Sequence, residues 1–333
     1  MGVRTRAHKR LRTRVNRRRR PADVRVMKAT TLAVVVLAAA AGCGGDGDGP
    51  WRSYSSPGMF GLNAVWTFAP DDVWAGGQSM LHFDGTAFAE VTIPQAGFVA
   101  DFLGFAPNDL YAVAGASLLH WDGAAWATVD FGGTIDPSGL TAIWGTSASD
   151  LWLGDSSNGR VHRWNGTTWS TTVTQVVEVT DIWGSSSSDV YVSGIFGLSH
   201  WNGTTLTESD DFLVDHSDGL WGTGPGDVWA VSEIGELAHW DGAAWTDTLP
   251  LDNDLFHEDH SKVWGSAPND VWAVGSFGAL SHWNGSGWSQ TQYGKFPYFP
   301  YLYAVHGSAP GNVWAVGFSS DGSNANVILH LEQ

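Results

Sequence analysis

Short runs of β-branched and aromatic residues alternate with turn-forming residues along most of the chain. In residues 263–288, VWGSAPNDVWAVGSFGALSHWNGSGW, three such runs, VWG, VWAVG and ALSHW, are followed by a fourth that starts at Trp288. The SAPND segment carries residues typical of turns, and Asn284-Gly285 is typical of a tight hairpin. This pattern predicts four short antiparallel strands that form one small twisted sheet.

The same unit occurs seven times. An acidic or amide residue before the second expected strand marks each copy: Asp72, Asp109, Asp150, Asp189, Asp227, Asp270 and Asn312. Successive markers are 37, 41, 39, 38, 43 and 42 residues apart, close to the period of a four-stranded propeller blade. Because one such sheet cannot bury both of its apolar faces alone, the copies must stack on one another. The period predicts an all-β, seven-bladed β-propeller.

The tryptophans indicate how the ring closes. All 20 fall on four positions of the repeat, one on each expected strand. Trp51 precedes the first complete copy, whereas the last copy ends after residues 327–330 without a fourth strand. Pairing of residues 51–55 with that last copy would remove an exposed sheet edge at each end of the array. We therefore expect one domain, residues 51–333, whose final blade is built from both ends.

Three segments of different composition precede the repeats. Residues 1–26 are rich in arginine and are interpreted as a basic extension or as the result of a start codon assigned too early, Met1 in place of Met27. Residues 27–42 combine a positive charge, an apolar run and small residues, as in a signal peptide. Residues 43–50 are glycine-rich and polar, which is typical of a flexible tether.

The end of the apolar run resembles the lipobox of bacterial lipoproteins. It reads Ala40-Ala41-Gly42-Cys43, with Ala40 where that family usually has leucine. The resemblance implies that Cys43, the single cysteine of the chain, carries a lipid, and a single cysteine forms no internal disulfide. Gly44 favours the outer membrane by analogy. We expect an exported, lipid-anchored protein facing the periplasm or the exterior; an ordinary signal peptide with an incidental cysteine is the alternative.

The leader conceals how acidic the rest of the chain is. The whole sequence has 17 basic and 34 acidic side chains, a net charge of −17. Twelve of the basic residues lie in residues 1–28, so that beyond Cys43 five basic residues face 33 acidic ones, a net charge of −28. A domain this acidic repels nucleic acid and anionic lipid surfaces. No nucleic-acid partner is expected.

The expected strand order assigns each connection to one of two faces. Connections after the second and fourth strands share one face, called here the top face, and they differ in every copy, whereas the bottom turns repeat almost unchanged. Repeat proteins commonly bind through the face that carries their variable loops. We expect a monomeric ring that binds its partner there.

One top connection, residues 251–261, is a candidate metal site. It reads LDNDLFHEDHS, and its carboxylates and imidazoles are ligands suited to Ca²⁺ or to a transition metal. The spacing matches neither an EF-hand nor HExxH, and acidic loops of this kind are usually only solvated. No other cofactor is expected. The candidate ligands are Asp252, Asp254, His257, Glu258, Asp259 and His260.

The next top connection, residues 293–303, is a candidate binding loop. It reads YGKFPYFPYLY, and its two prolines stiffen it. Aromatic side chains on a stiff loop are suited to sugar rings or to a protein partner, although the loop could instead fold over the ring as a plug. The candidate contacts are Tyr293, Phe296, Tyr298, Phe299 and Tyr301.

Two further sets of polar residues recur at fixed positions. Near the start of the first strands, Asp101, Asp181, Asp218 and Lys262 vary among copies and are expected at the upper mouth of the central channel, as a polar site or as groups that hydrate it. One third-strand position is histidine in six copies and Arg163 in the other. Because these histidines recur, we expect them to hydrogen-bond within or between sheets rather than to bind metal: His82, His120, His200, His239, His282 and His330.

The repeat as a whole resembles a known group. Its consensus, I/V-W-G-S/T-S/A-x-x-D-V-W-A-V-G followed by H-W-N/D-G-x-x-W, is similar over residues 51–333 to propeller repeats of bacterial, particularly myxobacterial, surface lipoproteins. It is more remotely similar to tectonin-type lectins and to two-component-regulator propellers. The resemblance implies a non-enzymatic protein that binds a protein partner. The alternatives are a lectin for envelope or extracellular polysaccharide and, less favoured because its sequence box is absent, a sialidase-like hydrolase.

Overall fold

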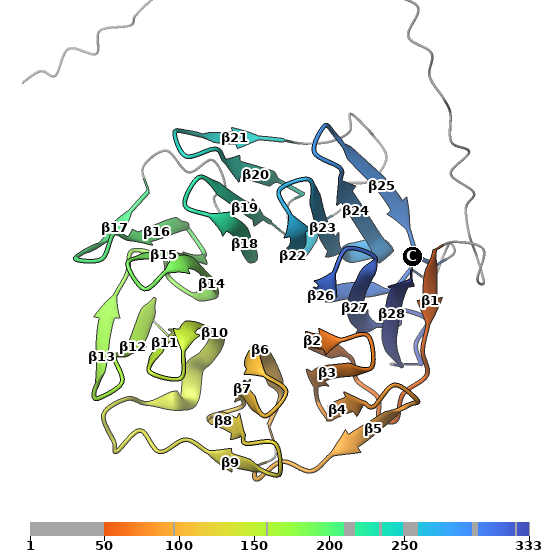
Figure 1. The fold of residues 1–333 in the computed structure, drawn as a ribbon, viewed down its shortest axis with the longest axis horizontal. Coiled ribbons are helices and arrows are strands. Elements are labelled where there is room, and N and C mark those ends of the chain that lie inside the picture. The colour runs from red at the N-terminus through yellow and green to blue at the C-terminus, as the bar shows by residue number, and fades with distance from the viewer. Residues whose placement is uncertain are drawn as a thin grey trace, which may run out of the picture. The chain divides into compact units, whose positions relative to one another are not determined.

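The computed structural model describes residues 50–95, 97–157, 159–209, 217–232, 235–248, 259–294, 299–323 and 325–332. All of them belong to one compact unit, Ala41–Gln333. Within these ranges, 28 strands form seven four-stranded antiparallel sheets that stand around a central axis (Figure 1). The predicted all-β, seven-bladed propeller is confirmed. Residues 1–49, with the expected signal peptide and Cys43, lie outside the described residues.

The first four blades follow the chain in order. Blade 1 contains β2 (Leu62–Ala69), β3 (Asp72–Gly77), β4 (Met80–Phe83) and β5 (Phe88–Val91). Blade 2 contains β6 (Val99–Ala106), β7 (Asp109–Ala114), β8 (Leu118–Trp121) and β9 (Trp126–Thr128). Blade 3 contains β10 (Leu140–Ser147), β11 (Asp150–Asp155), β12 (Arg160–Trp164) and β13 (Trp169–Val173). Blade 4 contains β14 (Val179–Ser186), β15 (Asp189–Gly194), β16 (Gly197–Trp201) and β17 (Leu206–Glu208).

The remaining blades complete the ring. Blade 5 contains β18 (Gly219–Gly224), β19 (Asp227–Val231), β20 (Leu237–Trp240) and β21 (Trp245–Asp247). Blade 6 contains β22 (His260–Ala267), β23 (Asp270–Gly275), β24 (Ala279–Trp283) and β25 (Trp288–Gln292). Blade 7 contains β26 (Tyr301–Ala309), β27 (Asn312–Phe318), β28 (Asn326–Glu332) and β1 (Trp51–Ser53).

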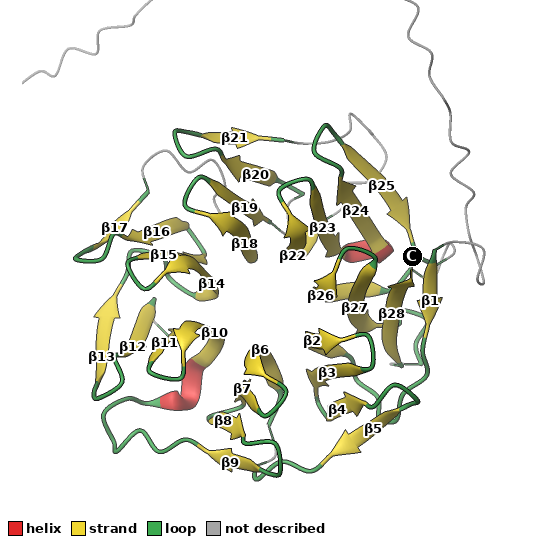
Figure 2. Ribbon diagram, in the orientation of Figure 1, coloured by secondary structure: helices red, strands yellow, loops and turns green. Residues whose placement is uncertain are grey.

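Helices are nearly absent from the described residues. Two single-turn 3-10 helices, η1 (Pro137–Gly139) and η2 (Ser276–Gly278), lie in top connections (Figure 2). Neither of them, and no other helix in the described part of the chain, has the length and apolar character needed to cross a bilayer.

The final blade is assembled from both ends of the chain, as the tryptophan pattern predicts. β1 pairs antiparallel with β28, with Trp51 opposite Leu331. The Trp51 side chain is 6% exposed, and its ring meets Trp272 of blade 6 edge to face at 5.3 Å. The segment after β1 continues the pairing, because the Tyr54 amide donates to the Ile328 carbonyl at 2.9 Å. The N-terminal strand therefore covers an edge that would otherwise be exposed.

The first strand of most blades is longer than the pattern predicts. β22, for example, begins at His260, three residues before the VWG run, and its pairing with β23 shifts register between His260 and Lys262. The pattern misses these residues because small or charged side chains at the channel interrupt the apolar run. Three of the charged residues expected at the channel mouth, Asp101, Asp181 and Lys262, are consequently part of the strands themselves, and Asp218 directly precedes β18.

A hydrogen bond inside each blade explains the recurring histidines. The marker residue opens the second strand, and in six blades its side-chain oxygen Oδ1 lies 2.6–2.8 Å from the imidazole Nε2 of the third strand. The imidazole also stacks on the second-strand aromatic ring, as His282 does on Trp272 at 4.1 Å. In blade 3, Arg163 replaces the histidine, donates to Asp150 and lies 4.9 Å above the Trp152 ring. The expected hydrogen-bonding role within the sheet is confirmed.

The Trp-Gly pair of the first strands joins neighbouring blades. A Cβ atom added at Gly265 would lie 2.5 Å from a ring carbon of Trp221 in the preceding blade, closer than real Cβ atoms come. Gly184, Gly222 and Gly307 would meet the preceding blade's tryptophan in the same way, so each indole requires a glycine beside it. Where the ring closes, between blades 7 and 1, both partners change. His306 replaces the tryptophan, Thr67 replaces the glycine, and the Thr67 amide donates to the Nδ1 atom of His306 at 3.1 Å.

Candidate binding face and central channel

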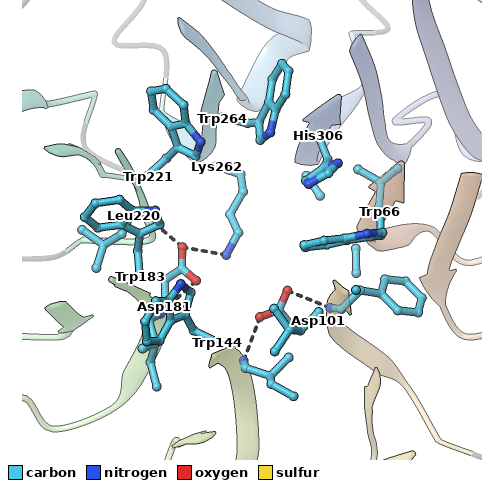
Figure 3. A pocket seen from close by; sticks show the side chains of 18 of the residues that line it. Trp66, Asp101, Trp144, Asp181, Trp183, Leu220, Trp221, Lys262, Trp264 and His306 are labelled. Atoms are coloured by element: carbon cyan, nitrogen blue, oxygen red, sulfur yellow. Dashed lines mark hydrogen bonds and ion pairs between the residues drawn. The ribbon is translucent and has the colours of Figure 1, made fainter. Parts of the chain in front are cut away.

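The inner strands of the seven blades surround a central cavity of about 370 Å³. Most of its lower wall is aromatic (Figure 3), because the tryptophan of the Trp-Gly pair, or its replacement, faces the axis. His306 stacks on Trp66, with ring centroids 4.3 Å apart, and lies 5.6 Å from Trp264. The aromatic residues at this strand position are Trp66, Trp144, Trp183, Trp221, Trp264 and His306, and Leu103 occupies it in the remaining blade.

Two carboxylates in the channel connect neighbouring blades. Asp101 of β6 accepts the Phe102 amide at 2.8 Å and the Ile143 amide of the next blade at 2.9 Å. Asp181 of β14 repeats this arrangement with the Ile182 amide at 3.0 Å and the Leu220 amide of the next blade at 2.8 Å. Each carboxylate therefore satisfies backbone donors of two inner strands that are about 40 residues apart in sequence.

Lys262 of β22 supplies the positive charge in this channel. Its Nζ lies 2.9 Å from Asp181 Oδ2 (Figure 3), and the two side chains are 24% and 6% exposed. Desolvation lowers the pKa of Lys262, but the charges of Asp181 and Asp101 and the hydrogen bond to Asp181 outweigh it, so that the pKa is raised overall. The lysine is therefore charged at neutral pH.

The other titratable groups of the channel are shifted by burial. Burial and, to a smaller extent, the charge of Asp181 raise the pKa of Asp101 to about 6, although Lys262 and the two amides oppose the shift. Burial lowers the pKa of His306 to about 3, which leaves its imidazole neutral at physiological pH. The structure places Asp101, Asp181 and Lys262 together in the channel, in the layer below the mouth at which the sequence predicts them. Their role in binding a ligand stays a prediction.

Above this layer the channel opens at the top face. A second cavity of about 370 Å³ is lined there by polar side chains that include Thr141, Thr180, Asp218 and Ser261, with Tyr303 beside them. In sequence, each of these residues comes one position before the one that Asp101 and Asp181 occupy in their own inner strands. Asp218 thus belongs to the mouth of the channel, where the sequence places it.

Exposed apolar side chains gather on the top face. Among the described residues, every exposed large hydrophobic side chain lies in a connection after a second or fourth strand or at the top end of such a strand. The set has seven members: Met59, Phe60, Phe98, Val173, Val177, Phe196 and Phe277. Phe196 is 67% exposed and Phe60 is 63% exposed. The bottom turns of the described chain contribute none, so the two faces of the ring differ chemically.

Three of these phenylalanines hold an unfavourable backbone conformation. Phe60, Phe196 and Phe277 have φ of 80°, 70° and 56°, and within the described ranges they are the non-glycine residues with positive φ. Such a conformation costs about 1–3 kcal/mol for a residue with a Cβ, and strain of this kind concentrates at functional sites. These residues are not among the candidate contacts that the sequence predicts. The available signal was the Phe-Gly pair, which recurs in four top connections and whose phenylalanine is exposed in three of them, Phe131 being buried.

The described part of the aromatic loop packs onto the ring. Tyr301 begins β26 and stacks on Phe318 at 5.2 Å, and Tyr293 is partly buried against the core between blades 6 and 7. The Phe299 carbonyl accepts a hydrogen bond from the Ser320 hydroxyl. Phe296 and Tyr298, which the sequence also marks as contacts, lie outside the described residues.

The candidate metal loop is described only at its end. Asp259 accepts a hydrogen bond from the Ser276 hydroxyl at 3.2 Å. His260 is 3% exposed, its Nε2 lies 2.9 Å from the Ser281 hydroxyl, and burial lowers its pKa to about 4. Within the described ranges no group of three or more histidine, cysteine or acidic residues is placed to hold a metal. The other four candidates lie outside those ranges: Asp252, Asp254, His257 and Glu258.

The fold places the chain among the seven-bladed propellers. No family model matches its sequence, and no curated protein matches it. The structure is similar to that of YCF48 bound to D1 peptide, with a TM-score of 0.67 and 17% identity over 86% of this chain and 97% of that one. It is also similar to virginiamycin B lyase from Staphylococcus aureus, with a TM-score of 0.69 and 10% identity over 85% of this chain and 99% of the lyase.

A domain of a two-component system is also similar. The extracellular domain of the hybrid two-component system BT4673 from B. thetaiotaomicron has a TM-score of 0.64 and 13% identity, over 84% of this chain and 39% of that one. This finding agrees with the remote similarity to two-component-regulator propellers that the repeats indicate. At these identities the similarities show the fold alone, and the three proteins include both a peptide complex and an enzyme.

Proposed function

We propose that this chain is a non-enzymatic, lipid-anchored propeller of the cell envelope that binds a protein partner through its top face. The observation that carries the proposal is the segregation of exposed apolar side chains: the seven in the described residues all lie on that face. Exposed apolar groups that gather on one side of a soluble domain commonly mark an interaction surface. The strained backbone of three of the phenylalanines supports a role in binding, because folding alone would favour glycine there.

The remaining parts of the proposal rest on sequence and on analogy. The YCF48 propeller has been solved with a peptide bound, which shows that a ring of this architecture accommodates a protein ligand. The anchor is a lipid on Cys43, the location is the outer membrane, and the ring acts as a monomer without a resident cofactor. The acidic propeller favours a protein partner with basic residues beside its apolar ones.

Replacing the strained phenylalanines with glycine tests this function. We expect that the triple variant Phe60→Gly, Phe196→Gly and Phe277→Gly folds at least as stably as the parent, because glycine adopts positive φ without strain. We expect it to capture about tenfold less of its partner from solubilised envelope fractions, since loss of central aromatic contacts typically costs 2 kcal/mol or more, roughly 30-fold in affinity. Affinity capture followed by mass spectrometry measures the difference.

A matched control distinguishes the loss of top-face contacts from a general effect of introducing glycine. Ala124→Gly and Ala243→Gly place glycine at two exposed residues of bottom hairpins and should leave capture unchanged. Undiminished capture by the triple variant would contradict the proposal. Recovery of polysaccharide in place of protein, lost in the same variant, would replace it with the lectin alternative.

A further inference from the structure

Acidic side chains outnumber basic ones among the residues that line the central channel. Asp101, Asp181 and Asp218 face its two cavities together with Glu178 at the mouth, whereas Lys262 supplies the positive charge among the described lining residues. His306, the remaining ionisable group of the aromatic wall, is neutral at pH 7 because burial depresses its pKa. The channel therefore has a net negative charge in surroundings of low dielectric constant, where charge interactions are strong.

The two carboxylates of the lower cavity share the charge of Lys262 but differ in their hydrogen-bond partners. Asp181 receives two amides and the Lys262 ammonium, at 2.9 Å. The hydrogen bonds of Asp101 come from two amides, those of Phe102 and Ile143, one on each oxygen. A carboxylate oxygen can accept a further hydrogen bond. Asp101 can thus accept from a donor in the cavity without giving up its structural contacts.

The cavity also has enough volume for a small ligand, and its wall is aromatic. At the position of Asp101 in the strand, four other blades carry residues with a short side chain or none, Ala64, Ala142, Gly219 and Ala304, so a volume of about 370 Å³ stays open at the axis. In Figure 3 the indole of Trp66 and the imidazole of His306 lie on the same side of the channel as Asp101. Indole rings attract cations through their π-electrons.

We propose that the channel binds a small organic cation whose primary ammonium group donates to the Asp101 carboxylate while its carbon chain lies against the tryptophan wall. The N–H donors of the ammonium can reach the acceptor position that stays free on each oxygen of Asp101. An anion would meet a net negative channel, and a bare metal ion would find two carboxylates already engaged with amides and, among the described residues, no group of three histidine, cysteine or acidic ligands. An organic cation with an apolar chain complements both the negative charge of the channel and its aromatic wall.

The proposal implies a pH dependence of binding. Ammonium binding requires the ionised carboxylate of Asp101, whose pKa burial raises to about 6. Affinity should therefore be nearly constant above pH 7 and fall about tenfold by pH 5, where most of this carboxylate is protonated. Two other groups that face the cavity change little over this range, because Lys262 stays charged and His306 stays neutral. Asp181 faces the cavity as well, 2.9 Å from Lys262.

Calorimetric titration of the full chain with n-butylammonium tests the proposal, with 1-butanol as the neutral probe of the same size. We expect millimolar affinity for n-butylammonium, as for other ligands of five heavy atoms, a change in tryptophan fluorescence, and no binding of 1-butanol. Asp101→Asn keeps the shape of the side chain but removes its charge, and it should weaken binding about 10- to 100-fold. Asp71→Asn, an exposed aspartate of a bottom turn, is the matched control and should bind as the parent does.

Lys262→Met provides an independent outcome. Removal of the competing ammonium leaves two carboxylates for the probe, so n-butylammonium should bind this variant more tightly and raise its melting temperature more than that of the parent. The proposal is overturned if the parent shows neither heat nor fluorescence change with n-butylammonium, or if Asp101→Asn and Lys262→Met bind it as the parent does. Equal binding of 1-butanol would also overturn it, because the channel would then select apolar chains and not cations.

Discussion

A chain that lacks residues 51–55 should be at least about 5 kcal/mol less stable to unfolding than the parent, enough to remove most of the stability of a typical domain. The deletion takes away β1 and exposes the edge of β28. It also removes two aromatic side chains: the buried Trp51, which packs against Trp272, and the partly buried Tyr54, which packs against Phe83 and Trp314. Loss of one buried aromatic ring of this size typically costs 3–5 kcal/mol. Urea denaturation followed by tryptophan fluorescence measures the change.

A substitution on the same strand separates ring closure from charge. Arg52 is exposed and lies 3.5 Å from Glu332 across the β1–β28 pair. Arg52→Ala should change the free energy of unfolding by less than about 1 kcal/mol, because exposed ion pairs contribute little. If the deletion and Arg52→Ala have the same midpoint, the N-terminal strand does not hold the ring closed.

Asp181→Ala should lower the free energy of unfolding by about 3–5 kcal/mol. It leaves the Lys262 ammonium without its partner at 2.9 Å and leaves the Leu220 amide of the next blade without its acceptor. Removing one member of a buried ion pair is costly because the other charge stays desolvated. Thermal and urea unfolding of the variant measure the loss.

A second substitution identifies the cause of that loss. Asp181→Ala combined with Lys262→Met removes the uncompensated charge and should recover a large part of the stability, so that the two changes are strongly non-additive. Additive effects would show that the lysine and the aspartate act independently, which the structure contradicts.

Much of the fold could be predicted because a repeat presents the same signal seven times. The turn before each marker residue, Asp72 for example, defines the period, and Trp51 alone indicates how the ring closes. The pairing of the marker with the third-strand histidine was only partly foreseen: the sequence indicates that both recur, whereas the register that brings Asp227 to His239 appears only in the sheet.

Contacts between blades could not be read from the sequence in the same way. Asp101 accepts the amide of Ile143, 42 residues away, and such a partner follows from ring geometry and not from any local pattern. The Trp-Gly pair was visible as a motif, but its cause lies in the indole of the preceding blade, as Gly265 beside Trp221 shows.

The candidate site was the hardest part to predict. The most unusual segments of the sequence are two loops, residues 251–261 and 293–303. Much of the first and part of the second lie outside the described residues. The exposed phenylalanines escaped it because one aromatic residue in a turn, such as Phe196, resembles any other core-forming residue until its exposure and backbone angle are known.

Site-specific photo-crosslinking in intact cells tests the claim of a top-face partner most directly. A photoreactive phenylalanine analogue would replace Phe196 on the top face or Ala243 in a bottom hairpin, and covalent adducts would be identified by mass spectrometry. The proposed function predicts one recurrent protein adduct from position 196 and none from position 243. Adducts from position 243 alone, or no adduct from either position, would contradict it.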